Sequence, residues 1–291
     1  MTGGQLLLQP FAEYGFMRRG LVATIALGLG GAPVGTLLVL RRMSLTGDAI
    51  AHALLPGAAL GFMAGGFSLV AMGGGAFAAA LAVALAAGFV TRATRQSEDA
   101  NFAAFYLIAL ALGVLLISTH GTSVDLMHML FGSILAVDDA ALLLMAAVAS
   151  LTLLTLAVVY RPLVVECVDP GFLRSMGGPG ALVHAVFLAL AVANLVAGFL
   201  ALGTLMAVGV MMLPAAAARF WAAEVWSLML AAAVIAVLSG AIGLLLSYHG
   251  HWPSGPAIVL VAGAIYLASL VAGPREGLLW QRLRRLTHRA A

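Results

Sequence analysis

The sequence predicts an all-α, multi-pass membrane protein with eight or nine transmembrane helices. Hydrophobic residues make up 63% of the 291 residues and charged residues only 9%, whereas charged residues are about 25% of an ordinary soluble domain. The mean hydropathy is +1.11. Apolar stretches of about 20 residues, the length at which a helix crosses a bilayer, follow one another along almost the whole chain.

Nine such stretches can be delimited, and short connectors join most of them. In order, they cover residues 20–40, 45–66, 69–91, 101–118, 138–160, 180–200, 202–220, 226–247 and 255–273. Because no long polar segment separates them, we expect a single transmembrane domain over residues 1–291. Two connectors are longer than the others. Residues 119–137 mix polar and apolar residues in an amphipathic pattern, and residues 161–179 are polar and contain proline and glycine.

Small residues and one proline shape the expected packing. The chain has 34 Gly and is rich in Ala, and small residues let helices approach closely inside a membrane. In the second stretch, Pro56-Gly57 predicts a break in the helix, and broken helices often mark a substrate path.

The arginines predict which side of the membrane each end faces. Cytoplasmic segments carry an excess of positive residues, so the tail 282–289 is expected inside. Counting back through nine spans also places Arg219, residues 161–179 and Arg92 inside, and the N-terminus outside. Arg18-Arg19 then fall at the outer face, unless residues 5–17 form an interfacial helix or two of the stretches form one broken span.

Composition also excludes several functions. The chain has no Lys, so it has no Walker A loop, which requires Gly-Lys-Ser/Thr. Its one cysteine, Cys167, excludes an internal disulfide and a multi-cysteine metal cage. The net charge of +3 does not indicate a nucleic-acid partner, because the arginines lie at the ends of the apolar segments.

The strongest candidate site is a carboxylate and an imidazole within the second apolar stretch. Asp48 and His52 are four residues apart, so on a helix they share one face. A charged group at the centre of a span costs about 2.5–3.5 kcal/mol, and a bound divalent metal would offset that cost. The alternative is that Asp48 caps this helix after Thr46-Gly47, where the helix dipole favours a negative charge.

Other histidines and methionines are weaker candidates. His120, Asp125 and His128 form either an entry vestibule that attracts a dication or a solvated outer loop. The pair His249 and His251 is expected at the surface. We expect four further residues to pack against neighbouring helices: His184, Met206, Met211 and Met212.

The connector 161–179 is either an ordinary loop or a docking element. The sequence ECVDPGFLRSMGG contains a turn signal at Asp169-Pro170-Gly171 and a short apolar patch at Phe172-Leu173. These features fit a short helix lying along the cytoplasmic face and contacting a partner protein.

Several segments resemble the permease subunits of ABC importers for zinc, manganese and iron(II). The most specific is RRMSLTGDAIAHALLPGAALG, residues 41–61. LFGSIL (130–135), GTLMAVGVMMLPAAAAR (203–219) and GLLLSYHGHWPSGPAIVL (243–260) resemble further family segments in the same order. The resemblance covers residues from about 15 to 272.

The resemblance implies an assembly in which this chain has no enzymatic activity of its own. It implies two permease copies, identical here, with the helical fold of the cobalamin and siderophore (type II) importers. It also implies two ATPase subunits, an extracytoplasmic metal-binding protein and a location in the bacterial inner membrane. No permanent cofactor is expected, because the metal is the transported substrate.

The resemblance also assigns roles to residues. The family's intramembrane Asp and His match Asp48 and His52. Its cytoplasmic docking helix matches about residues 166–177, with pattern positions at Glu166, Asp169, Pro170, Arg174 and Gly177. Val168 departs from the pattern, because the family usually has Phe there.

Zinc is the expected substrate, because imidazoles at 120, 128, 249 and 251 suit zinc, and manganese or iron is the alternative. A secondary transporter, in which Asp48 and His52 relay protons, is a further alternative.

Overall fold

The computed structural model describes residues 9–66, 68–94, 96–119, 137–275 and 277–280, and every regular element in this part of the chain is a helix. The long helices are α2 (Gly15–Leu40), α3 (Thr46–Gly65), α4 (Leu69–Ala93), α5 (Glu98–Thr119), α7 (Asp139–Val168), α9 (Gly180–Leu202), α11 (Val225–Gly250) and α12 (Ser254–Ala272). Two shorter helices are α8 (Pro170–Ser175) and α10 (Thr204–Ala218). The predicted all-α class is confirmed.

All nine predicted stretches are helical, and eight of them are long and apolar enough to cross a membrane. The exception is α10, whose 15 residues give a length of about 22 Å at about 1.5 Å per residue. Gly203, with φ of 88°, joins it to α9. Across this one-residue connector, Gly198 and Ala207 lie in contact, so α9 and α10 form a tight hairpin.

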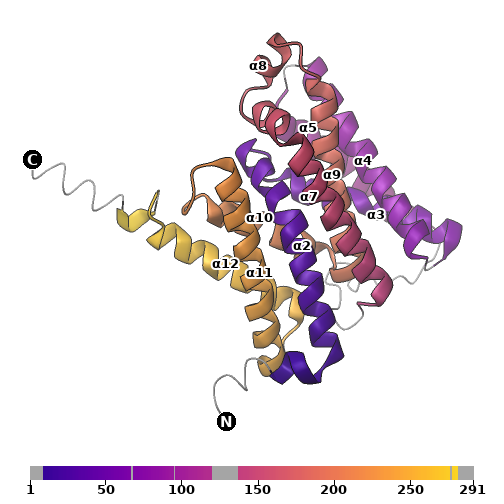
Figure 1. Ribbon diagram of the computed structural model, residues 1–291. Helices are drawn as coiled ribbons and strands as arrows, with labels where there is room; N and C mark the ends of the chain where they lie inside the picture. Colours follow the sequence, from indigo (N-terminus) through magenta and orange to yellow (C-terminus); the bar gives the residue numbers. More distant parts are fainter. Residues whose placement is uncertain (1–8, 67, 95, 120–136, 276, 281–291) are drawn as a thin grey trace, which may run out of the picture.

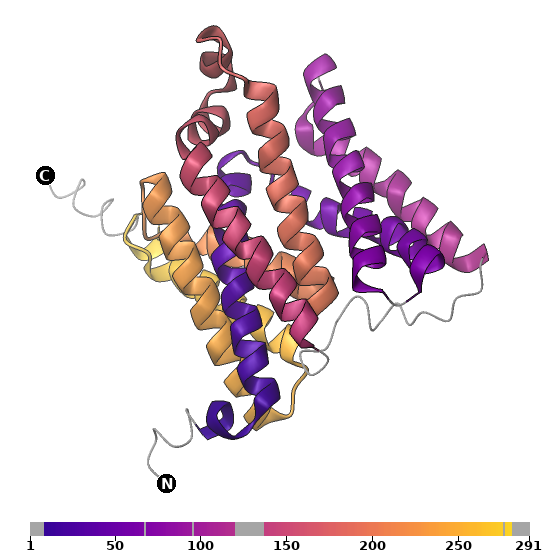
Figure 2. The ribbon, with the colours of Figure 1, turned by 45° about the vertical axis from the view of Figure 1, so that its right-hand side comes forward.

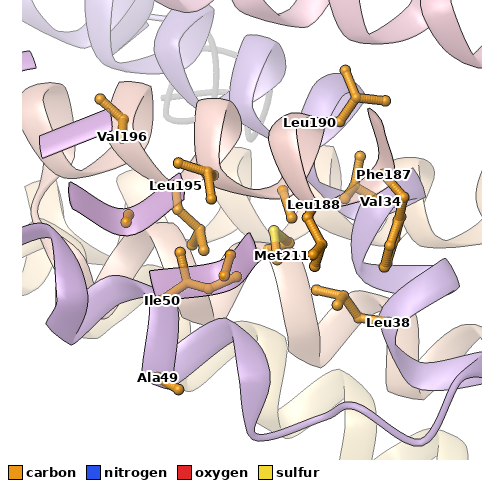
Figure 3. Close-up of a cluster of buried hydrophobic side chains, with 14 of the residues drawn as sticks. Val34, Leu38, Ala49, Ile50, Phe187, Leu188, Leu190, Leu195, Val196 and Met211 are labelled. Atoms are coloured by element: carbon orange, nitrogen blue, oxygen red, sulfur yellow. The ribbon is translucent and has the colours of Figure 1, made fainter. Parts of the chain in front are cut away.

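The helices form two groups that meet on α9 (Figure 1). α2 packs against α7, α9, α10 and α11, while α3, α4 and α5 pack mainly on one another. Figure 2 shows the second group standing beside α9. The buried core between the groups draws on α2, α3, α9 and α10, where Ile50, Leu195 and Met211 come together (Figure 3).

Buried polar side chains form hydrogen bonds between helices within these groups. Asn194 of α9 donates its Nδ2 hydrogens to Thr152 Oγ1 of α7, at 2.8 Å, and to the Leu190 carbonyl, at 2.9 Å. Asn101 of α5 donates to Thr91 Oγ1 of α4 at 2.9 Å. Inside a membrane such groups must find protein partners, because no water is present to bind them.

The structure corrects two predictions, a break in α3 and the end of α7. Helix α3 runs unbroken through Pro56-Gly57, because a proline removes a single backbone donor and the packed neighbours, including Gly113 of α5 against Pro56, hold the helix in place. Helix α7 continues beyond residue 160 to Val168 and includes Pro162, since polar residues at a helix end need not terminate it.

Asp138 is the N-cap of α7, where its carboxylate accepts a hydrogen bond from the Ala141 N–H at 2.8 Å. Met206 and Met211 are buried, as predicted for packing residues. Residues 120–136 and the tail 281–291 lie outside the described residues. The membrane orientation therefore remains a prediction.

α3 and α4 are in close backbone contact. Gly57, Gly61 and Gly65 repeat every four residues on α3, and a Cβ at Gly57 or Gly61 would collide with the backbone carbonyl of Gly75 or Ala71 on α4. Only glycine permits this approach, in the way small residues act at other membrane helix crossings.

We predict that Gly61→Ala lowers the free energy of unfolding by about 1–3 kcal/mol, the cost of overpacking against a backbone that cannot yield. Gly74→Ala on α4 is the matched control, because a Cβ there meets nothing within 4 Å. It should be neutral or stabilising. Thermal unfolding of both variants in the same detergent measures the difference, and equal stabilities would contradict this account of the α3–α4 contact.

Candidate functional site

Asp48 and His52 lie in the first two turns of α3. The sequence suggested that Asp48 lies in the interior of the span. It is instead the third residue of this helix and occupies its first turn. This position matches the alternative in which the helix dipole favours its charge. It does not cap the helix, however, because the N-cap residue is Leu45 and it makes no side-chain cap bond.

The two side chains point toward each other on an accessible face. His52 Nε2 lies 3.6 Å from Asp48 Oδ1, and the side chains are 32% and 61% exposed. The neighbouring Ile50 and Ala51 are buried. The pair is therefore held by a rigid helix while remaining open to a ligand or to another protein surface.

The separation is too long for a hydrogen bond and is close to, though slightly longer than, that between two ligands of one metal ion. Ligand atoms at about 2.1 Å from a metal, at angles of about 90–110°, are about 3.0–3.5 Å apart. Within the described residues no group of three His, Cys, Asp or Glu side chains is arranged to hold a metal. One chain thus offers two of the four or more ligands that a transition metal takes.

Tyr106 of α5 is a site residue that sequence reasoning missed. Its ring stacks on the His52 imidazole with centroids 6.0 Å apart and planes at 28°. His52 Nδ1 is buried and has no hydrogen-bond partner. Stacking therefore orients this ring, a role that metal-ligating histidines usually give to a hydrogen bond. Nothing in the sequence signals this contact, because Tyr106 lies on a different helix.

The other predicted metal residues do not join this pair. His120, Asp125 and His128 lie outside the described residues, so their vestibule role remains a prediction. His249 and His251 lie at the end of α11, which packs on α2, α10 and α12. His184 is 5% exposed at the start of α9, where its Nδ1 lies 2.6 Å from Arg41 Nη1.

The predicted docking segment 166–177 divides into three parts. Residues through Val168 complete α7, Asp169 is the N-cap of the short helix α8, and Gly177, with φ of 73°, ends the following turn. Asp169 accepts a hydrogen bond from the Phe172 N–H at 2.9 Å. The helix is thus shorter than predicted, because the segment ahead of Asp169 extends α7 instead.

α8 stands at one end of the bundle (Figure 1), and an exposed apolar patch runs from the last residue of α7 across α8 to the residue after it. Val168, Phe172 and Met176 are 70%, 53% and 70% exposed, whereas Leu173 is 9% exposed and anchors the helix. An exposed apolar patch of this kind is typical of a protein contact. Glu166 does not belong to it, because this side chain is only 2% exposed and pairs with Arg92.

Arginines from several helices gather beside α8. Arg92 of α4 donates from Nη2 to Glu166 Oε1 of α7 at 3.0 Å and to the Gly180 carbonyl of α9 at 3.3 Å. The Arg41 guanidinium lies 5.5 Å from the centre of the Phe187 ring. Arg41, Arg92 and Glu166 line a cavity of about 350 Å³, together with Arg174 of α8.

Comparison with known proteins supports the resemblance noted in the sequence. The chain is 31% identical over 277 residues to the manganese transport system membrane protein MntC of Listeria innocua, covering 95% of this chain and 98% of that protein. It is also 31% identical over 266 residues to the chelated iron transport system membrane protein YfeD of Yersinia pestis, covering 91% and 88%.

The fold is similar to that of solved structures. PsaBC from Streptococcus pneumoniae, solved in complex with Fab, matches with a TM-score of 0.82 and 29% identity over 95% of this chain and 98% of that one. An inward-facing metal-chelate type ABC transporter shares the fold, with a TM-score of 0.70 and 16% identity over 90% of this chain and 87% of that one. The model of the ABC 3 transport family matches residues 13–273, and the chain belongs to this family.

Proposed function

We propose that this chain is the permease subunit of an ABC importer in the bacterial cytoplasmic membrane, with a divalent transition metal as its substrate. The observation that carries the proposal is the Asp48–His52 pair, whose 3.6 Å separation is close to that of two ligands of one metal ion, in a chain whose relatives are named as metal transport membrane proteins. Two donors per chain fit a pathway formed by two copies, in which two Asp48 and two His52 surround the metal.

Manganese is the substrate that the relatives favour, and iron is second. Carboxylate and imidazole ligands accept Mn²⁺, Fe²⁺ and Zn²⁺ alike, so the ligand types do not decide among them. The sequence favoured zinc because of imidazoles at 120, 128, 249 and 251. That argument loses weight for His249 and His251, which lie at the end of α11, because α11 packs on α2, α10 and α12 and not on α3, the helix that carries Asp48 and His52.

ATP hydrolysis belongs to a partner in this proposal, because the chain lacks the Lys of a Walker A loop. The exposed apolar patch at α8, formed by Val168 at the end of α7, Phe172 of α8 and Met176 just after it, is the proposed contact for that ATPase. An extracytoplasmic binding protein would deliver the metal to the opposite end of the bundle. His52 must be neutral to bind a metal, whereas Asp48 must be ionised.

The test is metal uptake into proteoliposomes that contain this chain, its ATPase partner and its binding protein. Mn²⁺, Fe²⁺ and Zn²⁺ compete in the presence and absence of ATP. ATP-dependent Mn²⁺ uptake that Zn²⁺ does not displace supports the proposal. Uptake driven by a proton gradient without ATP would instead identify a secondary transporter in which Asp48 and His52 relay protons.

We predict that Asp48→Asn reduces uptake to background, because the amide keeps the shape of the side chain but loses the charge that binds the metal. His52→Ala should have the same effect. Asp139→Asn is the matched control: Asp139 also lies in the first turn of its helix, and its side chain is 89% exposed. Assembly with the ATPase, measured by co-purification, should be unchanged in all three variants. Full uptake by the Asp48 and His52 variants would contradict the proposal that these two residues bind the metal.

We further predict that Phe172→Asp weakens binding of the ATPase by about tenfold, since loss of an apolar anchor at an interface typically costs about 1–2 kcal/mol. Ser175→Asp is the control, because it places the same charge on the same helix outside the apolar face. Titration of the ATPase against the detergent-solubilised permease measures both affinities. Equal weakening by the two variants would indicate a general effect of charge rather than a contact through Phe172.

A further inference from the structure

The partly buried ion pair between Arg92 and Glu166 has no part in the function proposed so far. Arg92 Nη2 lies 3.0 Å from Glu166 Oε1, and the two side chains are 34% and 2% exposed. The second carboxylate oxygen, Oε2, is buried without a hydrogen-bond partner. A buried carboxylate is costly unless it is paired, so Arg92 is the group that keeps Glu166 in place at the end of α7.

On one side the pair leads directly to α8. Glu166 precedes Asp169, the residue that caps α8, by less than one helical turn. α8 in turn exposes the apolar face proposed to contact the ATPase. A displacement of α8 therefore reaches Glu166 through a few residues of continuous backbone.

On the other side the pair leads to the metal ligands. Arg92 lies in the last turn of α4, and α4 meets α3 backbone to backbone at Gly57, Gly61 and Gly75. Helices in such close contact cannot slide past each other without a steric clash, so α3 and α4 move together. α3 carries Asp48 and His52.

We infer that the Arg92–Glu166 ion pair is the positioning link that transmits movement of α8 to the helix pair α3–α4 and so couples ATP hydrolysis to metal release. This inference rests on the proposed function. The cavity of about 350 Å³ beside the pair, lined also by Pro170 and Arg174 of α8, gives α8 room to shift while the ion pair stays closed. Arg92 and Glu166 touch neither the metal nor ATP; they act through α4 and α7.

The experiment uses the full complex of permease, ATPase and binding protein in proteoliposomes. Glu166→Gln and Arg92→Gln each remove one charge with little change in shape. Arg161→Gln is the matched control, because Arg161 is an exposed arginine on the same helix as Glu166. For each variant, the ATP hydrolysis rate, the metal taken up and the melting temperature are measured together.

We expect the Glu166→Gln and Arg92→Gln complexes to hydrolyse ATP at nearly the normal rate while the metal transported per ATP falls by about tenfold, a typical size for coupling between sites. Arg161→Gln should leave this ratio unchanged. The charge-reversed double variant, Arg92→Glu with Glu166→Arg, should recover part of the lost ratio, since it restores an ion pair at the same place.

An unchanged ratio in both single variants would overturn the inference, as would a loss of hydrolysis and transport in parallel with a lower melting temperature. If Glu166→Gln fails to fold, Arg92→Gln decides, because it removes the ion pair at the partly exposed partner and leaves the buried residue unchanged: a lowered ratio at normal stability supports the link, and a normal ratio overturns it. Absence of ATP-dependent uptake in the unaltered complex would refute the proposed function itself, which distinguishes that failure from failure of the link.

Discussion

The backbone contact between α3 and α4 is the constraint on which the rest of the candidate site depends. At Gly57, Gly61 and Gly75 the two helices approach until no side chain fits between them. This contact fixes the rotation of α3 about its axis, so Ile50 enters the core while Asp48 and His52 face outward. It also places α5 beside α3, where Tyr106 stacks on His52. A different rotation of α3 would keep the two ligands side by side but turn both of them into the core or away from Tyr106.

The proposed metal site and the proposed coupling link differ in how exposed their charged groups are. The Asp48–His52 pair is open and incomplete, with two donors that a second copy of the chain would complement. The Arg92–Glu166 pair is closed, with Glu166 buried, Arg92 partly exposed and the two charges matched inside one chain. An open pair can exchange its ligand readily, whereas a closed pair holds its geometry. This division suits a protein that must release a cation at one place while keeping its moving parts joined at another.

Hydropathy predicted the helices well because a membrane span is set by the length of an apolar run, a property that is local in the sequence. The sequence also identified Asp48 and His52, since their spacing of four residues is itself local. It failed where the answer depends on distant partners. Pro56 does not break α3, because neighbouring helices support it. Glu166 resembled a surface docking residue, yet Arg92, far away in the sequence, draws it into the interior. Tyr106 left no local signal at all.

The brevity of α10 has a consequence for how the protein enters the membrane. Fifteen residues reach only about three quarters of the way across a hydrocarbon core of about 30 Å. Such a helix is a poor substrate for insertion as an independent segment. Its one-residue connection to α9 through Gly203 means that the pair must enter together as a preformed hairpin. α10 then finds its place among α2, α9, α11 and α12, where surrounding protein rather than lipid satisfies its buried end. Biogenesis of this bundle therefore depends on the later helices closing around a segment that could not remain in the bilayer alone.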